Sequence, residues 1–415
     1  MFQPNFLGPL TRTGTDLYQL ALAGFYKQNP GVEVKLVSIY GDWWANPQQI
    51  IAGTAADVIW DYYPPSYMAS QQSKGLLWPL DAWMQRDGID VTAWSAGQIG
   101  SYRQAAPDHQ LYMLPNYFSP LVYVVRLSDF DSEGYPRPDP NWTYSEFTTM
   151  CSQMTKSRST GLKRYGAVLD WHSSGIGGAT WPFYCWGDGM VTAQGYAQLN
   201  TTAGLQAGSW LYEELLWPGY ATVRNVMDPG ANPQAQIQDQ VVAQLVWGGS
   251  QVLYQAEHYT GFLWDYYLPP QFPNGYTCSG TDDFFAIPAS TKHPEQAWEL
   301  LKFISYDATP TGWQQQNMKI TLIQPCLNSL WDMWIHTLQS VAPPLRDKNL
   351  NAFKTMALNG RALPEEYFPY GDSQVRNLEQ SVLSNLWNQT TTVPSGWHDL
   401  DLQINALVKT LIPAG

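Results

Sequence analysis

The segment A-D-V-I-W-D-Y-Y-P-P-S-Y-M-A-S-Q-Q-S-K-G-L-L-W-P-L-D, residues 56–81, says most about the fold of this 415-residue chain. Residues 57–60 form a short apolar run typical of a buried strand, and the proline pair at 64–65 begins a segment that we predict to be helical to about residue 74. The strand ends in Asp61, Tyr62 and Tyr63. Open α/β sheets bind their ligands at the carboxyl ends of such strands. The alternative interpretation is a strand–helix turn with exposed aromatic rings.

The sequence around this segment alternates between helix and strand patterns. Residues 15–29 carry apolar side chains at helical spacing, and residues 32–40 alternate as a strand. Residues 110–125 contain two strand runs, which we expect to be interrupted at Pro115-Asn116-Tyr117. Further helices are predicted at about residues 144–155, 202–216, 294–305, 345–357, 374–388 and 397–411. This β-α-β order predicts a mainly parallel sheet with both faces covered.

The composition points to a globular protein with aromatic surfaces and an acidic charge. Lys and Arg total 22 against 35 Asp and Glu, a formal net charge of −13, which argues against binding to nucleic acid or to anionic membranes. There are 20 Trp and 25 Tyr, and this many Trp residues exceeds what a core needs. Flat rings that line a groove suit sugars and other ring-shaped ligands. The alternative, core packing, must account for most of the Trp residues in any case.

No metal, cofactor or catalytic motif is recognisable in the sequence. The four cysteines, Cys151, Cys185, Cys278 and Cys326, form no C-x-x-C pair, and one or two disulfides or four buried thiols are equally open. The six histidines never approach metal-ligand spacing. Motifs for a nucleophile elbow, a phosphate loop, a zinc protease or a dinucleotide fold are missing. A glycosidase needs only two carboxylates, for which Asp61, Asp265, Asp282 and Glu257 are the candidates.

The sequence also bears on the location of the protein. No apolar run approaches the ~20 residues of a membrane span. Met1 leads directly into F-Q-P-N-F-L-G-P-L, which does not have the pattern of a signal peptide. We therefore expect that a signal region belongs ahead of this sequence.

Four segments in the same order resemble the extracellular solute-binding proteins of ABC importers, in the sugar-binding group that includes maltose-binding protein. They are F-Y-K-Q-N-P-G-V-E-V at 25–34, A-A-D-V-I with K-G-L-L-W-P-L-D at 55–59 and 74–81, D-H-Q-L-Y-M-L-P at 108–115 and T-K-H-P-E-Q-A-W-E-L-L-K-F-I at 291–304. Each segment is short, but their common order over residues 25–304 is specific.

The resemblance implies a type II periplasmic-binding-protein fold, with two α/β lobes that close on a ligand about a strand hinge. Residues 1–118 plus 286–325 would form the N-terminal lobe, and residues 119–285 plus 326–415 the C-terminal lobe. Such a protein is not an enzyme and needs no cofactor or metal. It is expected to act as a monomer outside the cytoplasm, periplasmic or lipid-anchored, and to deliver a carbohydrate to ABC permease subunits.

The resemblance and the strand ends together suggest which residues contact the ligand. A carboxylate accepts hydrogen bonds from two sugar hydroxyls, and aromatic rings stack on sugar faces. The second lobe contributes A-T-W-P-F-Y-C-W-G-D at 179–188 and the glycine-containing loop in A-Q-L-V-W-G-G-S at 243–250. The candidate residues are Trp43, Trp44, Asp61, Tyr62, Tyr63, Asn116, Tyr117, Trp181, Trp186, Trp247, Asp282 and Asp283.

Two alternatives remain open from the sequence. The same fold could bind a polyamine or another cation, because an acidic cleft with aromatic walls suits cation–π contacts. A secreted carbohydrate-active enzyme is the weaker alternative.

Overall fold

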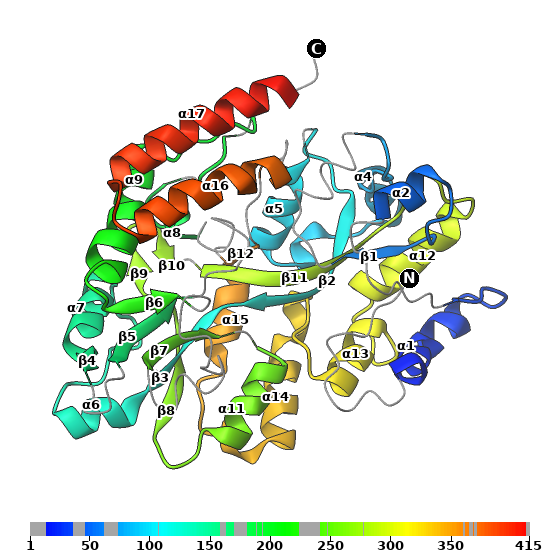
Figure 1. The fold of residues 1–415 in the computed structure, drawn as a ribbon. Helices are drawn as coiled ribbons and strands as arrows, with labels where there is room; N and C mark the ends of the chain where they lie inside the picture. Colours follow the sequence, from blue (N-terminus) through cyan, green and yellow to red (C-terminus); the bar gives the residue numbers. More distant parts are fainter. Residues whose placement is uncertain are drawn as a thin grey trace.

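The computed structural model describes most of the chain. It covers residues 14–35, 46–61, 74–106, 108–157, 163–169, 181–187, 189–192, 194–223, 241–246, 248–276, 278–359, 362–364, 368 and 372–411. Two sheets with helices packed around them make up this part of the molecule (Figure 1).

The first sheet is built around one long strand. β11 (Cys278–Ala286) pairs antiparallel with β2 (Met113–Pro120) along one edge. Its other edge pairs antiparallel with β1 (Ile59–Asp61) and parallel with β12 (Ala362–Pro364). The helices and turns near its β1 end are α1 (Gly14–Gln28), α2 (Asn46–Ile51), α4 (Asp81–Asp87), η2 (Val91–Ala93), α5 (Ala96–Ala105), α12 (Pro294–Tyr306) and α13 (Trp313–Thr321).

The second sheet has the strand order β4-β5-β7-β3-β8, and β6 also pairs with β5. Its strands are β3 (Val122–Arg126), β4 (Lys156–Ser157), β5 (Lys163–Leu169), β6 (Ala221–Val223), β7 (Val241–Val246) and β8 (Trp264–Tyr267), and a hairpin of β9 (Gln271–Phe272) and β10 (Gly275–Tyr276) lies nearby. The surrounding helices are α6 (Leu127–Glu133), α7 (Tyr144–Met154), α8 (Trp181–Trp186), α9 (Thr202–Gly208), the π-helix η4 (Ser209–Leu216), α11 (Ser250–His258), η5 (Asn328–Leu330), α14 (Trp331–Val341), η6 (Pro343–Leu345), α15 (Asn351–Leu358), α16 (Asp372–Trp387) and α17 (Val393–Leu411).

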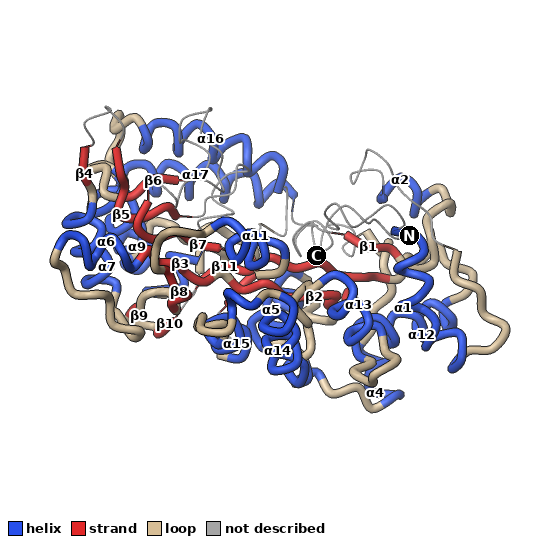
Figure 2. Tube along the Cα trace, turned by 90° about the horizontal axis from the view of Figure 1, so that it is seen from below, coloured by secondary structure: helices blue, strands red, loops and turns tan. Residues whose placement is uncertain are grey.

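Two separate hydrophobic cores correspond to two lobes. The first core takes buried side chains from residues 21–114, 284–313 and 326–330, and we call the part around it the first lobe. The second core takes them from residues 118–272, from Met318 and from residues 331–408, and defines the second lobe. β2 and β11 run side by side across the middle from one group of elements to the other (Figures 1 and 2). The lobes are therefore joined by paired strands.

Local sequence signals explain several element boundaries. Thr143 caps α7 through the backbone N–H of Glu146, whose carboxylate in turn accepts from the backbone of Thr143. α12 begins at Pro294, which suits a first helical position because proline has no N–H to donate. The predicted helices at 15–29, 144–155, 294–305 and 374–388 are confirmed to within two residues at each end.

Some sequence predictions were wrong. Residues 345–357 are split between η6 and α15. The helix predicted at 202–216 is confirmed, since α9 and the π-helix η4 together cover these residues. β2 continues as one strand through Pro115-Asn116-Tyr117, but its pairing is irregular there: Tyr117 pairs with Asp283 and Pro115 with Phe284, so Asn116 is an extra residue on β2. The sheets are mixed: among the described strands, six pairs are antiparallel and three parallel. Residues 32–35 are not in a strand, and residues 36–40 lie outside the described part.

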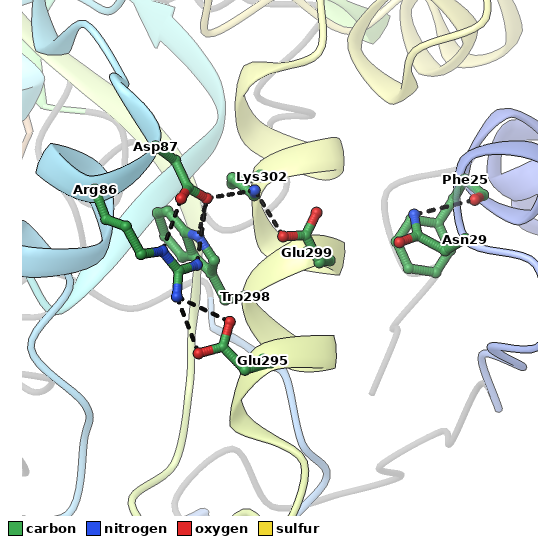
Figure 3. A network of polar contacts seen from close by, with 8 residues as sticks. All are labelled: Phe25, Asn29, Arg86, Asp87, Glu295, Trp298, Glu299 and Lys302. Carbon is green, nitrogen blue, oxygen red and sulfur yellow. Dashed lines mark hydrogen bonds and ion pairs between the residues drawn. The ribbon is translucent and has the colours of Figure 1, made fainter.

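A network of charged side chains joins α4 to α12 on the surface of the first lobe (Figure 3). Arg86 bonds to Asp87 at 2.7 Å and to Glu295 at 2.9 Å. Asp87 also accepts from Lys302 and from the indole N–H of Trp298, at 2.5 and 2.8 Å. These contacts hold two helices that are distant in sequence at a fixed angle.

Candidate functional site

The candidate site is the joint between the lobes, where three stretches of chain cross. β2 and β11 form two crossings and pair from Met113 with Ala286 to Pro120 with Gly280, with one register shift. The third connection follows α13: Leu322 packs against the second core, Cys326 to Leu330 pack in the first, and Trp331 packs in the second. β1 and β7, one from each lobe, end beside these crossings.

On β11, Asp282 is held by the first lobe. Its carboxylate accepts from the hydroxyl of Tyr102 at 2.5 Å and from the side-chain amide of Gln98 at 3.1 Å. Gln98 and Tyr102 lie one turn apart on α5, and the amide of Gln98 also donates to the carbonyl of Tyr117 on β2. All three side chains are buried. Burial, together with the charge of Asp282, raises the pKa of the Tyr102 hydroxyl well above its usual value, so this group remains a donor.

The neighbouring joint residues are also bonded within the first lobe. Asp283 accepts from the indole N–H of Trp60, the residue before Asp61 on β1, at 3.0 Å. The side-chain oxygen of Asn116 accepts from the indole N–H of Trp313 at 3.1 Å, and its backbone carbonyl accepts from Gln314 at 2.8 Å. Asn116, Tyr117, Asp282 and Asp283 are each less than 10% exposed. The structure thus places these four predicted ligand residues in the packing of the joint.

A second set of bonds ties the far end of β2 to the second lobe. The hydroxyl oxygen of Ser119 accepts from the backbone N–H of Gly248 at 3.3 Å and from the side-chain amide of Gln324 at 3.0 Å. A Cβ on Gly248 would lie 1.5 Å from the amide nitrogen of Gln324, so glycine is needed for this approach. Ser119 therefore joins β2, the turn between β7 and α11, and the third connection.

The remaining predicted ligand residues are only partly described. Trp43, Trp44, Tyr62, Tyr63 and Trp247 lie outside the described residues. Asp61 is the last residue of β1 and pairs with Phe284, and Trp181 is the first residue of α8, but their side chains are outside the description. Asp61 and the turn next to Trp247 nevertheless come from opposite lobes and meet the same strand pair.

Trp186, another predicted ligand residue, belongs to the aromatic packing of the second lobe. Its ring centroid lies 5.1 Å from that of Phe272, 5.5 Å from that of Tyr144 and 5.8 Å from that of Trp210. Trp210 is fully buried, and its indole N–H donates to Thr148. Core packing, the alternative considered from the sequence, accounts for the position of Trp186.

The titratable groups of the described part do not form a metal centre. Among the described residues no three His, Cys, Asp or Glu side chains come together in a way that could hold an ion. Cys151, Cys185 and Cys326 are buried, and burial raises the pKa of the Cys151 and Cys326 thiols. The side chain of Cys278 lies outside the description.

A cavity of about 490 Å³ lies behind the joint and has a wall from each lobe. Gly100, Arg103 and Gln104 of α5, with His109, line it on the first-lobe side. The second lobe contributes Val191, Thr192 and Gln198. The two lobes are thus not closely packed at this place.

The sequence analysis missed Gln98, Tyr102, Ser119 and Gln324. The spacing of Gln98 and Tyr102 is a helical i, i+4 pair, which indicates that both lie on one face of α5 but not that this face meets a buried carboxylate. Ser119 and Gln324 are more than two hundred residues apart in sequence, and only the fold brings them together.

The comparisons with known proteins agree with this architecture. The family model described as bacterial extracellular solute-binding protein matches residues 8–308, which is most of the chain. The chain belongs to this family. Its members are receptors that bind a solute for an ABC transporter and are not enzymes, so the family resemblance drawn from the sequence is confirmed. None of the described helices of this solute-binding protein is long and apolar enough to cross a membrane.

Solved structures of other solute-binding proteins share the fold at low sequence identity. The sugar-binding protein MalE from Xanthomonas citri is 16% identical with a TM-score of 0.73, and the match covers 95% of each chain. An ABC substrate-binding protein from Listeria monocytogenes in complex with cycloalternan is 16% identical with a TM-score of 0.69, over 95% of this chain and 96% of that one. UgpB from Mycobacterium tuberculosis, in complex with glycerophosphocholine, is 18% identical with a TM-score of 0.68, over 96% of each chain. No curated protein sequence matches the chain.

Proposed function

We propose that this solute-binding protein is an extracytoplasmic receptor that binds an oligosaccharide between its lobes and delivers it to an ABC importer. One observation carries the proposal. The end of β1 at Asp61 is paired with β11, while the turn at Gly248 is bonded to Ser119 of β2. A strand end from each lobe therefore meets the same strand pair, and a ligand held between these ends would be enclosed when the lobes rotate.

The chemistry near these strand ends suits a neutral polyol. A carboxylate at Asp61 would accept hydrogen bonds from two hydroxyls, and Tyr62, Tyr63 and Trp247 would supply ring faces for stacking. The missing side chain of Gly248 makes room for Gln324, and Gly249 has a left-handed φ of 62° that other residues rarely adopt, so both glycines set the shape of this turn. We propose Trp43, Trp44 and Trp181 as further ring contacts. Asn116, Tyr117, Trp186, Asp282 and Asp283 would support the site rather than touch the ligand.

The proposed lobes follow the division expected from the sequence, with changes at the boundaries. Residues 1–118 plus 286–325 would form one lobe and residues 119–285 plus 326–415 the other. Phe118 packs in the second core, whereas Phe284 and Phe285 pack in the first, which supports moving the first two boundaries to before each of these positions. Cys326, Leu327 and Leu330 pack in the first core, which supports moving the third boundary to after Leu330.

The known structures favour a carbohydrate without fixing it. MalE is named as a sugar-binding protein, and the protein from Listeria monocytogenes holds cycloalternan. UgpB holds glycerophosphocholine on the same fold, which makes this compound a necessary competitor. The net charge of −13 favours a polyamine as the second candidate, since a cation would be attracted to an acidic protein.

A thermal-shift screen tests the proposal. The panel holds mono- and oligosaccharides, with glycerophosphocholine, spermidine and amino acids as competitors. A ligand at a hundredfold excess over its dissociation constant stabilises by about 2.7 kcal/mol, which raises the melting temperature by several degrees. We expect one oligosaccharide class to give this shift, Asp61→Ala to lose it, and the exposed control Glu257→Gln to keep it.

The other outcomes have distinct meanings. A shift with spermidine alone, strongly reduced by added salt, would replace the carbohydrate with a cation. A shift with glycerophosphocholine alone would do the same for a phosphodiester.

A further inference from the structure

We propose that the second lobe carries a binding site of its own, a pocket that takes a small organic cation with an apolar ring. The pocket has a volume of about 360 Å³, a size typical of small-molecule sites. Its lining residues lie between Phe130 and Met154, on α6, on α7 and on the segment that connects these helices. α6 and α7 lie at the outer end of the second lobe, away from the strand pair at the joint (Figures 1 and 2). This pocket, which we call the α6–α7 pocket, is therefore separate from the site between the lobes.

The floor of the α6–α7 pocket is apolar and partly aromatic. Phe130, Trp142, Met150 and Met154 line the pocket and are buried in the core of the second lobe. Tyr135, which also lines it, is half-buried and packs against the same core. An apolar ring would displace water from this floor, and the faces of aromatic rings also attract a cation.

The rim of the α6–α7 pocket carries two exposed carboxylates, Asp139 and Glu146. One oxygen of Asp139 accepts from the backbone N–H of Asn141 at 2.7 Å. One oxygen of Glu146 accepts from the backbone N–H of Thr143, also at 2.7 Å, as part of the cap of α7. Within the described part of the chain, the second oxygen of each carboxylate has no hydrogen bond. Each rim carboxylate is therefore fixed through one oxygen and can accept from a ligand through the other.

The charge at the rim favours a cation over an anion. Arg137 is the only basic side chain among the described lining residues, and its guanidinium bonds to both carboxylate oxygens of Asp131, at 2.9 and 2.6 Å. This pairing neutralises Arg137 and leaves the charges of Asp139 and Glu146 in excess. The N-terminus of α7 lies at the same rim, but Glu146 in its first turn offsets the positive end of the helix dipole.

The walls of the α6–α7 pocket are held in place without a ligand. The indole N–H of Trp142 donates to the carbonyl of Leu268 at 2.8 Å, and its ring packs edge-on against Phe147 at 5.2 Å between centroids. Pro136 and Pro138 restrict the backbone of the connecting segment, because proline fixes φ. A ligand that enters a preformed pocket loses little free energy in ordering the protein.

Ligand-observed fluorine NMR on the full chain tests the α6–α7 pocket. The probe is fluorophenethylamine, whose ring matches the floor and whose ammonium group matches the rim. We expect its signal to broaden on addition of the protein, and a titration then gives the dissociation constant. The neutral fluorophenethyl alcohol and the anionic fluorophenylacetate have the same ring and should bind more weakly than the amine.

Variants assign the binding to this pocket. Asp139→Asn combined with Glu146→Gln removes both rim charges, and glutamine can replace glutamate in the cap of α7. We expect the amine to bind about fivefold more weakly to this double variant, because two exposed charges are lost. The matched control is Glu257→Gln combined with Asp399→Asn, which removes two exposed carboxylates outside the pocket and should leave the affinity unchanged. Thr149→Trp places a large side chain in the pocket and should abolish the broadening.

Three results would overturn the proposal. They are no broadening of the amine signal, equal affinity for the amine and the alcohol, and equal affinity of the two double variants for the amine. Binding that is lost in Asp61→Ala but kept in Thr149→Trp would place the amine between the lobes and would also overturn it. The thermal-shift screen with carbohydrates tests the site between the lobes, so the failure of one proposal is distinguishable from the failure of the other.

Discussion

Each lobe contains a cluster of charged side chains, and the two clusters differ in exposure. In the first lobe the network of Arg86, Asp87 and Lys302 lies on the surface, where Arg86 and its partner Glu295 are 43% and 59% exposed (Figure 3). In the second lobe Arg164 is 10% exposed and lies between Asp129 and Glu133, which are each 12% exposed. Surface ion pairs contribute little to stability, whereas a buried pair is costly to break. The two clusters should therefore differ strongly in how much free energy of unfolding is lost when one charge is removed.

Arg164→Ala should have the largest effect. Arg164 donates to the carbonyl of Met154 at 2.8 Å and forms ion pairs with Asp129 and Glu133. Its loss leaves two carboxylates buried with less compensation, which should cost about 3–5 kcal/mol in the free energy of unfolding. Urea denaturation measures this quantity. The matched control is Arg137→Ala, which removes an exposed pair with Asp131 and should cause no measurable change. Equal effects of the two variants would show that burial does not decide the cost of losing an ion pair.

Lys302→Met should have a smaller effect in the first lobe. Lys302 bonds to Asp87 and Glu299 and lies 5.7 Å from the centre of the Trp298 ring, and methionine keeps most of its apolar stem. Asp87 keeps its bonds to Arg86 and Trp298, so we expect a loss of about 1 kcal/mol or less in denaturation. Lys354→Met, which removes a pair with the 77% exposed Asp332, is the control. A loss as large as that of Arg164→Ala would show that the surface network acts as a buried one.

The smallest effect is the pH dependence of the surface network. Hydrogen bonds from Arg86 and Lys302 hold the pKa of the Asp87 carboxyl well below its ordinary value of 3.8. A lowered pKa in the folded state contributes stability above pH 3.8, and this contribution is lost as the pH falls further through the lowered pKa. Asp87→Asn should therefore melt slightly below the parent protein at neutral pH, and the difference should shrink under acid.

Asp401 provides a comparison of opposite sign in the second lobe. Burial raises the pKa of its carboxyl, although the backbone N–H groups of Asn200 and Leu199 act against this shift. A carboxyl pKa that is raised in the folded state makes the folded protein more stable at low pH than at neutral pH. As the pH falls, the parent protein should therefore gain stability relative to Asp401→Asn, whereas it should lose stability relative to Asp87→Asn. If the stability of Asp87→Asn and of Asp401→Asn, each relative to the parent protein, changed in the same direction with pH, the different environments of the two carboxyls would not set this pH dependence. Thermal melts over a range of pH measure it.

The sequence predicted the helices better than the strands for a physical reason. The apolar spacing of residues 294–305 is local and fixes α12 with almost no help from the rest of the chain. The pairing of β2 with β11 joins residues about 165 apart, and nothing in the local pattern gives its antiparallel direction. An interruption was expected at Pro115-Asn116-Tyr117, but β2 continues through it, with Asn116 as the extra residue opposite Asp283 and Phe284. Both the direction of the strand pair and the continuity of β2 depend on pairing between residues that are far apart in the sequence.

The sequence predicted which strand ends meet at the candidate site, but not which side chains there are free to contact a ligand. Asp61 does end a strand and meets the joint, as the abrupt change after Trp60 indicated. Asp282 and Trp186 are of residue types that often bind sugars. However, the Asp282 carboxylate accepts a hydrogen bond from Tyr102, and the Trp186 ring packs against Phe272. A single sequence does not distinguish a buried aromatic or carboxylate from one that faces a ligand, because both uses draw on the same residue types.

The three crossings also fix when the protein can finish folding during its synthesis. The first core needs Trp298 and Trp313, which are made only after the second sheet, and the second core needs side chains as late as Val408. A chain that ends before Trp298 therefore has two unfinished cores and much exposed apolar surface. Neither core is made from one continuous piece of chain: a stop before Leu330 removes side chains from both cores, whereas a stop between residues 331 and 408 removes them from the second core alone.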